Sequence, residues 1–287
     1  MFDLWVMGNA LIKISLYLGV FLSAGSAIVL FLYRDSLSRI SKDMAKKAAG
    51  FLALGLLAAG LSYLQRAAAL TGDIKSAWDF EILGILWQTP VGTVLILRVI
   101  GFCLLLISFL EFKLNRLVGL VGGIVLLASF TQIGHVYDLD SLVFKLLLLV
   151  HLVVVSFWVG ILWPLQRLSS DVTLSEEATE VAHRFGVHAS VLVPLLFIAG
   201  ILIGWNLLDG LSQLISTPYG QTLLIKLGFF TVLLCLAAAN KLRFVPAMRR
   251  QEERAFDHLV QSIKIERGLM FIILVTTAWL TSALTLP

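Results

Sequence analysis

Eight long apolar segments constrain the fold more than any other feature of this sequence. A bilayer core of about 30 Å takes about 20 helical residues to cross, and each segment is close to that length. The segments do not alternate as barrel strands do, so helices are expected to satisfy their backbone polar groups within lipid. We therefore predict an all-α polytopic membrane protein, a bundle of eight transmembrane helices that forms one integral membrane domain, residues 1–287. The predicted spans are approximately residues 10–33, 46–69, 90–111, 117–135, 142–166, 186–208, 219–240 and 265–286.

The composition supports a membrane protein and excludes other classes. Hydrophobic residues make up 59% of the chain and charged residues 14%, whereas a soluble domain has about 25% charged residues. The two cysteines lie inside apolar segments and indicate no disulfide framework. The basic residues adjoin membrane spans, so the net charge of +4 does not indicate nucleic acid as a partner. The partner that the composition indicates is the lipid bilayer.

The distribution of charge between the loops predicts the orientation. Most Lys and Arg residues lie in the links after the first, third, fifth and seventh spans. Cytoplasmic loops carry the excess of Lys and Arg, which places both termini outside, in the periplasm if this is a bacterial inner membrane. The links after the other spans are mainly acidic and hold Asp73, Asp79, Glu81, Asp138, Asp140 and Asp209.

A short internal repeat opens the third and seventh spans. Residues 89–98 read TPVGTVLILR and residues 217–226 read TPYGQTLLIK. The copies are four spans apart, so they predict two four-helix halves of parallel topology, approximately residues 1–135 and 136–287. Arg98 and Lys226 occupy matching places well inside their spans. Each is either a pathway residue or a cation that is paired or extends its long side chain to the membrane surface.

Two histidines, one at the end of the fourth span and one inside the fifth span, are the leading candidates for metal ligands. His151 lies about ten residues into the fifth span, which is ~15 Å deep at about 1.5 Å per residue. Trp158 follows two turns later on the same helix face. The His151 ring is either a metal or haem ligand or is satisfied by a neighbouring helix. His135 ends the fourth span beside Asp138 and Asp140, as an entry ligand or as a hydrated interfacial residue.

The remaining candidates are weaker. His188 opens the sixth span and is either an exit ligand or an interfacial histidine. Glu266 begins the last span one turn before Met270, either on the pathway or in a structural pair. Met7 lies near the outer end of the first span. Its thioether suits Cu(I), although isolated methionines in apolar helices usually pack. We predict no catalytic residue and no enzymatic activity.

The order of several motifs resembles the CopD family of copper-resistance inner-membrane proteins, relatives of PcoD. Three departures from the usual family pattern are Ser15-Leu16-Tyr17 in place of a first-helix histidine, Ile161 in place of a second glycine, and Gly186 in place of a serine. The motifs that carry the resemblance are Gly134-His135, His151 with FWVGILWPL, Arg184-Phe185, TPYGQTLLIKL, Asn240-Lys241-Leu242-Arg243 with Pro246, and Glu266.

The resemblance implies copper transport or copper binding in the bacterial inner membrane, beside a periplasmic partner of the CopC type. In this hypothesis His135 receives the ion as Cu(I), a soft cation that sheds water readily, His151 holds it near the midplane, and Trp158 shapes the site. The chain has no GxxxxGK[ST] motif for a nucleotide, so a gradient or a partner is expected to drive transport. The alternative is a haem b or quinone-linked electron-transfer protein with histidine axial ligands. A scaffold subunit with packing histidines is a third possibility.

Overall fold

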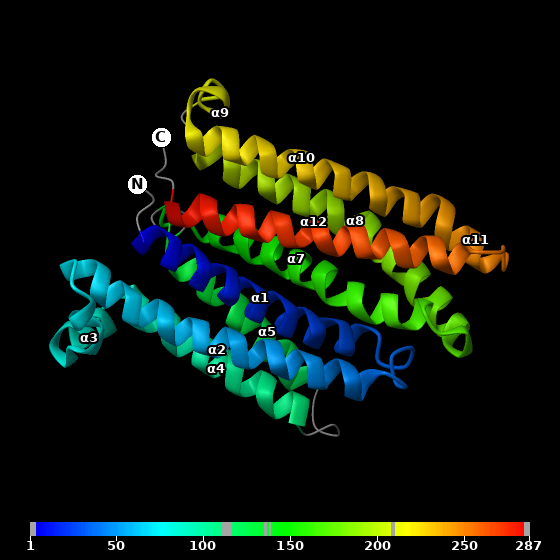
Figure 1. The fold of residues 1–287 in the computed structure, drawn as a ribbon, viewed down its shortest axis with the longest axis horizontal. Coiled ribbons are helices and arrows are strands. Elements are labelled where there is room, and N and C mark those ends of the chain that lie inside the picture. The colour runs from blue at the N-terminus through cyan, green and yellow to red at the C-terminus, as the bar shows by residue number, and fades with distance from the viewer. Residues whose placement is uncertain (1–3, 111–115, 135–136, 138, 208–209, 284–287) are drawn as a thin grey trace.

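The computed structural model describes residues 4–110, 116–134, 137, 139–207 and 210–283. Within these ranges the chain is helical with connecting turns, and they contain no β-strand. Eight of the helices that the described residues form make up the bundle, and Figure 1 shows how they are arranged. They are α1 (Leu4–Leu32), α2 (Ser41–Thr71), α4 (Pro90–Leu110), α5 (Arg116–Ala128), α7 (Leu142–Ser169), α8 (Ser175–Leu207), α10 (Pro218–Ala239) and α12 (Ala255–Ala283).

Six of these helices are long and apolar enough to cross a membrane, namely α1, α2, α4, α7, α8 and α10. Two of the eight predicted spans do not meet the same test over the described residues. The α5 segment is a shorter apolar helix, which continues through the 3-10 turn η2 (Ser129–Gln132). The α12 helix is long enough, but its first turns are polar. The structure thus confirms an all-helical chain with at least six membrane-competent helices.

Short helices connect the long ones and distinguish the two ends of the bundle. One end of the bundle, which we call the acidic end, holds the short helices η1 (Ile74–Trp78), α3 (Phe80–Trp87) and α9 (Gln213–Ser216). The turns η3 (Val172–Leu174), η4 (Asn240–Phe244) and α11 (Val245–Arg249) lie at the other, the basic end. The α1 helix begins and the α12 helix ends at the acidic end (Figure 1).

The α8 helix begins eleven residues earlier than the predicted span that starts at residue 186. Its first turn carries Glu176 and Glu177, and negative side chains there are favoured by the helix dipole. Because these turns are polar, the apolar pattern alone could not place the start of the helix.

The α1 helix occupies the centre of the bundle and packs on α2, α5, α7 and α12. Its crossing with α7 depends on Gly25 and Gly160. A Cβ atom added at Gly160 would lie 2.4 Å from the carbonyl carbon of Gly25, and one at Gly25 would lie 2.0 Å from the carbonyl oxygen of Ser156. The two backbones therefore touch, as small residues allow in membrane helix pairs.

The two copies of the internal repeat fold in the same way locally. Thr89 Oγ1 donates to Leu86 O at 2.7 Å, and Thr217 Oγ1 donates to Gln213 O at 2.7 Å. Proline follows each threonine at the start of its helix, where its missing N–H costs nothing. Two residues after the proline, Gly92 and Gly220 lie against the preceding short helix, with no room for a Cβ atom.

Candidate functional site

A cavity of about 470 Å³ lies in the acidic-end part of the C-terminal helices. The helices α7, α8, α10 and α12 line it, and the segment around α9 covers one side. Its walls are mostly apolar, with three side chains that can bind or repel an ion. These three are His151, Lys226 and Met270.

His151 presents an unsatisfied nitrogen at this cavity. Its Nδ1 atom is buried and has no hydrogen-bond partner of regular geometry among the described residues, although the ring interacts with the backbone of Leu196 one turn before Gly200. The ring faces α8 at Gly200, where an added Cβ atom would lie 3.7 Å from Cε1 and 3.8 Å from Nδ1. A buried polar atom that lacks a partner is costly. The missing side chain at Gly200 leaves space beside the ring, so His151 is free to accept a ligand from the cavity.

Two more side chains of the His151 cavity can interact with an ion, the thioether of Met270 and the ammonium group of Lys226. Met270 is 6% exposed and comes from α12. Imidazole nitrogen and thioether sulfur are both donors that bind copper, and thioether favours Cu(I). Lys226 comes from α10 and is half-buried. Its four-carbon stem can lie along the apolar wall while the ammonium group reaches toward water. The sequence reasoning named Lys226 but did not place it beside His151.

Over the described residues of the N-terminal half, the equivalent position is closely packed. There α2 packs directly on α4, whereas α8 and α10 make no comparable direct packing over the described residues. The space between α2 and α4 that includes Arg98 measures about 10 Å³. Since Arg98 and Lys226 occupy matching places in the repeat, the same location is filled in one half and open in the other.

Arg98 has a structural environment. It is 5% exposed, its Nε donates to Ser129 Oγ at 3.4 Å, and its guanidinium lies 5.0 Å from the centre of the Phe130 ring. The predicted pathway residue Met7 is 44% exposed on α1 and does not line the His151 cavity. His135 lies outside the described residues, so its role as an entry ligand stays a prediction.

His188 lies apart from His151. Its Nδ1 atom and the Tyr33 hydroxyl are 2.8 Å apart and form a hydrogen bond between α8 and α1. The ring also meets Phe157 edge-on. His188 precedes Gly200 by twelve residues on α8, which is ~18 Å along the helix axis at about 1.5 Å per residue. The structure therefore does not bring the two histidines to one ion.

A buried polar cluster lies between α7, α12 and η4. Trp158 Nε1 donates to Glu266 Oε2 at 3.2 Å, and Asn240 Nδ2 donates to Glu266 Oε1. Glu266 is 1% exposed and Trp158 is 2% exposed. Trp158 does not line the His151 cavity, and its indole nitrogen binds Glu266, so its role in shaping a copper site stays a prediction.

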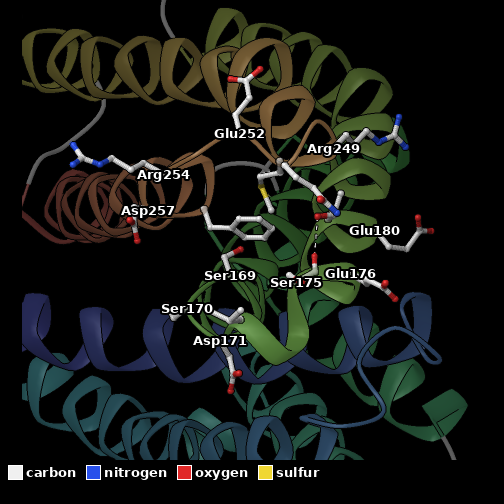
Figure 2. A pocket seen from close by; sticks show the side chains of 15 residues that line it. Ser169, Ser170, Asp171, Ser175, Glu176, Glu180, Arg249, Glu252, Arg254 and Asp257 are labelled. Atoms are coloured by element: carbon white, nitrogen blue, oxygen red, sulfur yellow. Dashed lines mark hydrogen bonds between the residues drawn. The ribbon is translucent and has the colours of Figure 1, made fainter.

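A groove of about 670 Å³ lies at the basic end (Figure 2). The charged groups of Arg254 and Glu176 lie on opposite sides of the groove and point apart (Figure 2). Asp171 is held by Thr173 and by Arg167 rather than by groups across the groove. A solvated surface groove therefore fits better than a binding site.

Sequence reasoning missed two features of these cavities. The sequence indicated that Met270 lies one turn beyond Glu266 on the same helix face but did not place it beside His151. Asn240 was noted only as part of a motif. It begins η4, a single π-helical turn, and such turns are frequent at functional sites.

Two family models match the chain. "Copper resistance protein D" matches residues 179–280, and "Copper resistance protein D-like, N-terminal domain" matches residues 1–143. The first covers much of the C-terminal part of the chain and the second covers the N-terminal part. No solved structure matches.

Two curated proteins illustrate the relationship. The copper transport protein CutJ of Bacillus subtilis (strain 168) is 27% identical over 296 residues, which cover 96% of this chain and 52% of CutJ. The inner membrane protein YebZ of Escherichia coli (strain K12) is 27% identical over 137 residues, 46% of each chain. The chain spans about half the length of the curated relatives it matches. With the family models in the same order as its motifs, this multi-pass inner-membrane protein belongs to the copper resistance protein D family.

Proposed function

We propose that this chain binds copper as Cu(I) in the His151 cavity and moves it across the inner membrane, contributing to copper homeostasis or resistance. The observation that carries the proposal is the buried Nδ1 of His151, which has no hydrogen-bond partner of regular geometry among the described residues and faces a cavity that Met270 also lines. The family, and the name of CutJ as a copper transport protein, support copper as the cargo. Imidazole and thioether favour the monovalent ion.

The proposed orientation has eight spans with both termini outside, so that the His151 cavity lies in the periplasmic half. The α5 helix with η2 rises about 27 Å, close to the bilayer core. The α12 helix has 29 residues and runs alongside α1 and α7. The two four-helix halves, residues 1–135 and 136–287, would then share a parallel topology in which the C-terminal half contains the site.

A periplasmic copper-binding protein of the CopC type remains the proposed donor. His135 is the proposed receiving ligand, with Asp140 nearby in sequence at the acidic end. A protein donor would hand the ion directly to the receiving ligand. Uptake at the periplasmic face would then need no nucleotide.

The haem b alternative requires axial ligands around one iron. Among the described residues, His188 is the other histidine in the transmembrane part, and it is ~18 Å along α8 from the level of His151. This arrangement favours copper over haem. An absorption spectrum of the purified full chain distinguishes copper from haem, because a Soret band would indicate haem. Extraction of an apolar quinone from the purified chain would indicate the quinone-linked alternative.

Copper binding tests the proposed function directly. The purified full chain is titrated with Cu(I) in competition with a chromophoric Cu(I) chelator, and bound copper is counted. We expect His151→Ala to lose the bound ion and His258→Ala, at the basic end beside Phe244, to retain it. Equal copper binding by His151→Ala and the wild type would contradict the proposal.

The orientation is tested with single cysteines in a Cys103→Ser/Cys235→Ser background. A membrane-impermeant maleimide added to intact cells or spheroplasts should label Lys75→Cys at the acidic end. It should label Arg249→Cys at the basic end only after the membrane is opened. The reverse pattern would show that the bundle is inverted.

A further inference from the structure

A second cavity of about 360 Å³ lies on the basic-end side of the His151 cavity. The helices α7, α8, α10 and α12 line it together with η4 and α11. Glu266 is buried in its wall, one turn before Met270 on α12. Trp158 lies two turns after His151 on α7 and, being 2% exposed, stands within the packed layer between the two cavities.

The hydrogen bonds of Glu266 leave its charge uncompensated. Trp158 and Asn240 donate one hydrogen bond each to the two carboxyl oxygens. The described residues record no ion pair for this carboxyl group within 4.0 Å. An ionised carboxylate removed from water without a cation partner is unfavourable, so the group either binds a proton or takes a cation from the cavity.

Asn240 adds an unused acceptor beside the carboxyl group. Its Oδ1 atom is buried and has no hydrogen-bond partner among the described residues. The π-helical turn that Asn240 begins interrupts the regular helix here, and such interruptions recur where a side chain has a functional position. A hydroxyl hydrogen on Glu266, or a water molecule, could satisfy this oxygen.

The chemistry of this pair favours a proton over copper. Carboxylate and amide oxygens are hard ligands, whereas Cu(I) prefers thioether, thiolate and imidazole. Buried acidic residues in membrane helices mark proton relays in pumps and transporters. The two cavities therefore offer different donor sets, with nitrogen and sulfur on the acidic-end side and oxygen on the basic-end side.

Few other charged groups face Glu266. From η4, Lys241 lines the same cavity, and its ammonium group donates to Ser190 Oγ on α8. The parts of α7, α8 and α11 that line the cavity contribute no titratable side chain among the described residues. On α12 itself, Arg267 donates to Gln166 Oε1. The α1 helix meets α12 through Lys13 and Tyr17, both of which contact Thr281 near the opposite end of α12.

We propose that Glu266 is a proton-binding residue that exchanges its proton with the basic-end solution through this cavity. The use of that proton to drive the cation rests on the proposed function, but the proton site itself does not require copper. When the carboxyl group ionises, its proton leaves toward the basic end, and the Trp158 and Asn240 donors bind the carboxylate more strongly. Protonation weakens the Trp158 contact and so alters the layer that separates the two cavities.

Infrared spectroscopy of the metal-free full chain tests the proton site. We expect the carbonyl stretch of a protonated carboxylic acid, sensitive to deuterium exchange, that disappears as the pH rises. Glu266→Gln should lack this band, and Glu180→Gln, an exposed carboxyl group on α8 paired with Arg184, should retain it. Absence of the band from the wild type at every pH that keeps the chain folded, or its survival in Glu266→Gln, overturns the proposal.

A second variant guards against a folding defect. If Glu266→Gln fails to fold, Glu266→Asp provides the test instead. This variant keeps a titratable group, so its carbonyl band should remain but appear at a shifted frequency and disappear at a shifted pH. Because both measurements are made without metal, their failure leaves the copper-binding result with His151→Ala unaffected. Failure of copper binding likewise leaves the infrared result standing.

Discussion

Trp158 Nε1 donates a hydrogen bond to Glu266 Oε2 at 3.2 Å and thereby joins α7 to α12 in the interior of the bundle. The two residues are 108 positions apart in the sequence. The bond lies between the two cavities of the C-terminal helices, where Met270 faces one and Glu266 the other. A change in this contact therefore affects the wall that both cavities share.

Replacement of Trp158 by Phe should destabilise the protein. The substitution leaves one buried carboxyl oxygen of Glu266 without its donor, and an unmet hydrogen bond of this kind costs about 1–3 kcal/mol. The melting temperature of the purified protein in detergent should fall accordingly. Trp78→Phe is the matched control, since Trp78 is 73% exposed at the acidic end. Equal melting temperatures for both variants would show that the Trp158 bond is not stabilising.

Replacement of Gly160 by Ala should separate α1 from α7. The new methyl group would lie 2.4 Å from a backbone atom of Gly25, and overpacking of this kind costs about 1–3 kcal/mol. Gly60→Ala is the control, because nothing lies within 4 Å of an added Cβ atom there. Alanine in a helix interior is favoured over glycine by up to about 1 kcal/mol, so this control should melt at the same or a higher temperature.

The positions of the helices could be predicted from local sequence, and their starting points could be predicted where a proline marks them. Thr217-Pro218 marks the start of α10, and Pro90 marks the start of α4, as the sequence indicated. The apolar segments likewise correspond in position to the eight long helices, although α5 and α12 are less clearly membrane spans by length and composition. The polar first turns of α8 were missed because they carry no apolar pattern.

The site could be predicted only in part because it depends on distances between helices. The depth of His151 followed from its place in an apolar run, but the space beside it depends on Gly200 and on the separation of α8 from α10. The partner of His188 is Tyr33, 155 positions away. A single sequence contains no signal that joins residues so far apart in the chain.

Asp171 should make the stability of the basic end depend on acid. Hydrogen bonds from the side chain and backbone of Thr173 lower the pKa of Asp171 from its ordinary value of 3.8, with Arg167 contributing in the same direction. The folded-state pKa is depressed, so the stabilisation is present above the unfolded value and is lost as the pH falls through the folded value. We expect Asp171→Asn to remove this loss below about pH 4. Melting temperatures across acidic pH provide the measurement. The control Glu253→Gln changes the net charge equally, and an unchanged acid dependence in Asp171→Asn would contradict the assignment.

His188 should behave as a structural residue in the copper-binding experiment. The Tyr33 hydroxyl is its hydrogen-bond partner, and Tyr33 is fully buried. His188→Leu leaves that hydroxyl without a partner and should lower stability by about 1–3 kcal/mol. Copper binding should persist, because His151 lies at a level ~18 Å further along α8.

A double-mutant cycle separates this structural role from a role as a ligand. Tyr33→Phe and His188→Leu remove the two partners of one hydrogen bond, so their effects on the free energy of unfolding should be non-additive by about 0.5–3 kcal/mol. The copper stoichiometry of the double variant should equal that of the wild type. The contrary result would be that His188→Leu loses bound copper, keeps the stability of the wild type, and shows no coupling energy with Tyr33→Phe. The histidine would then be a metal ligand, which is one of the two roles that the sequence suggested.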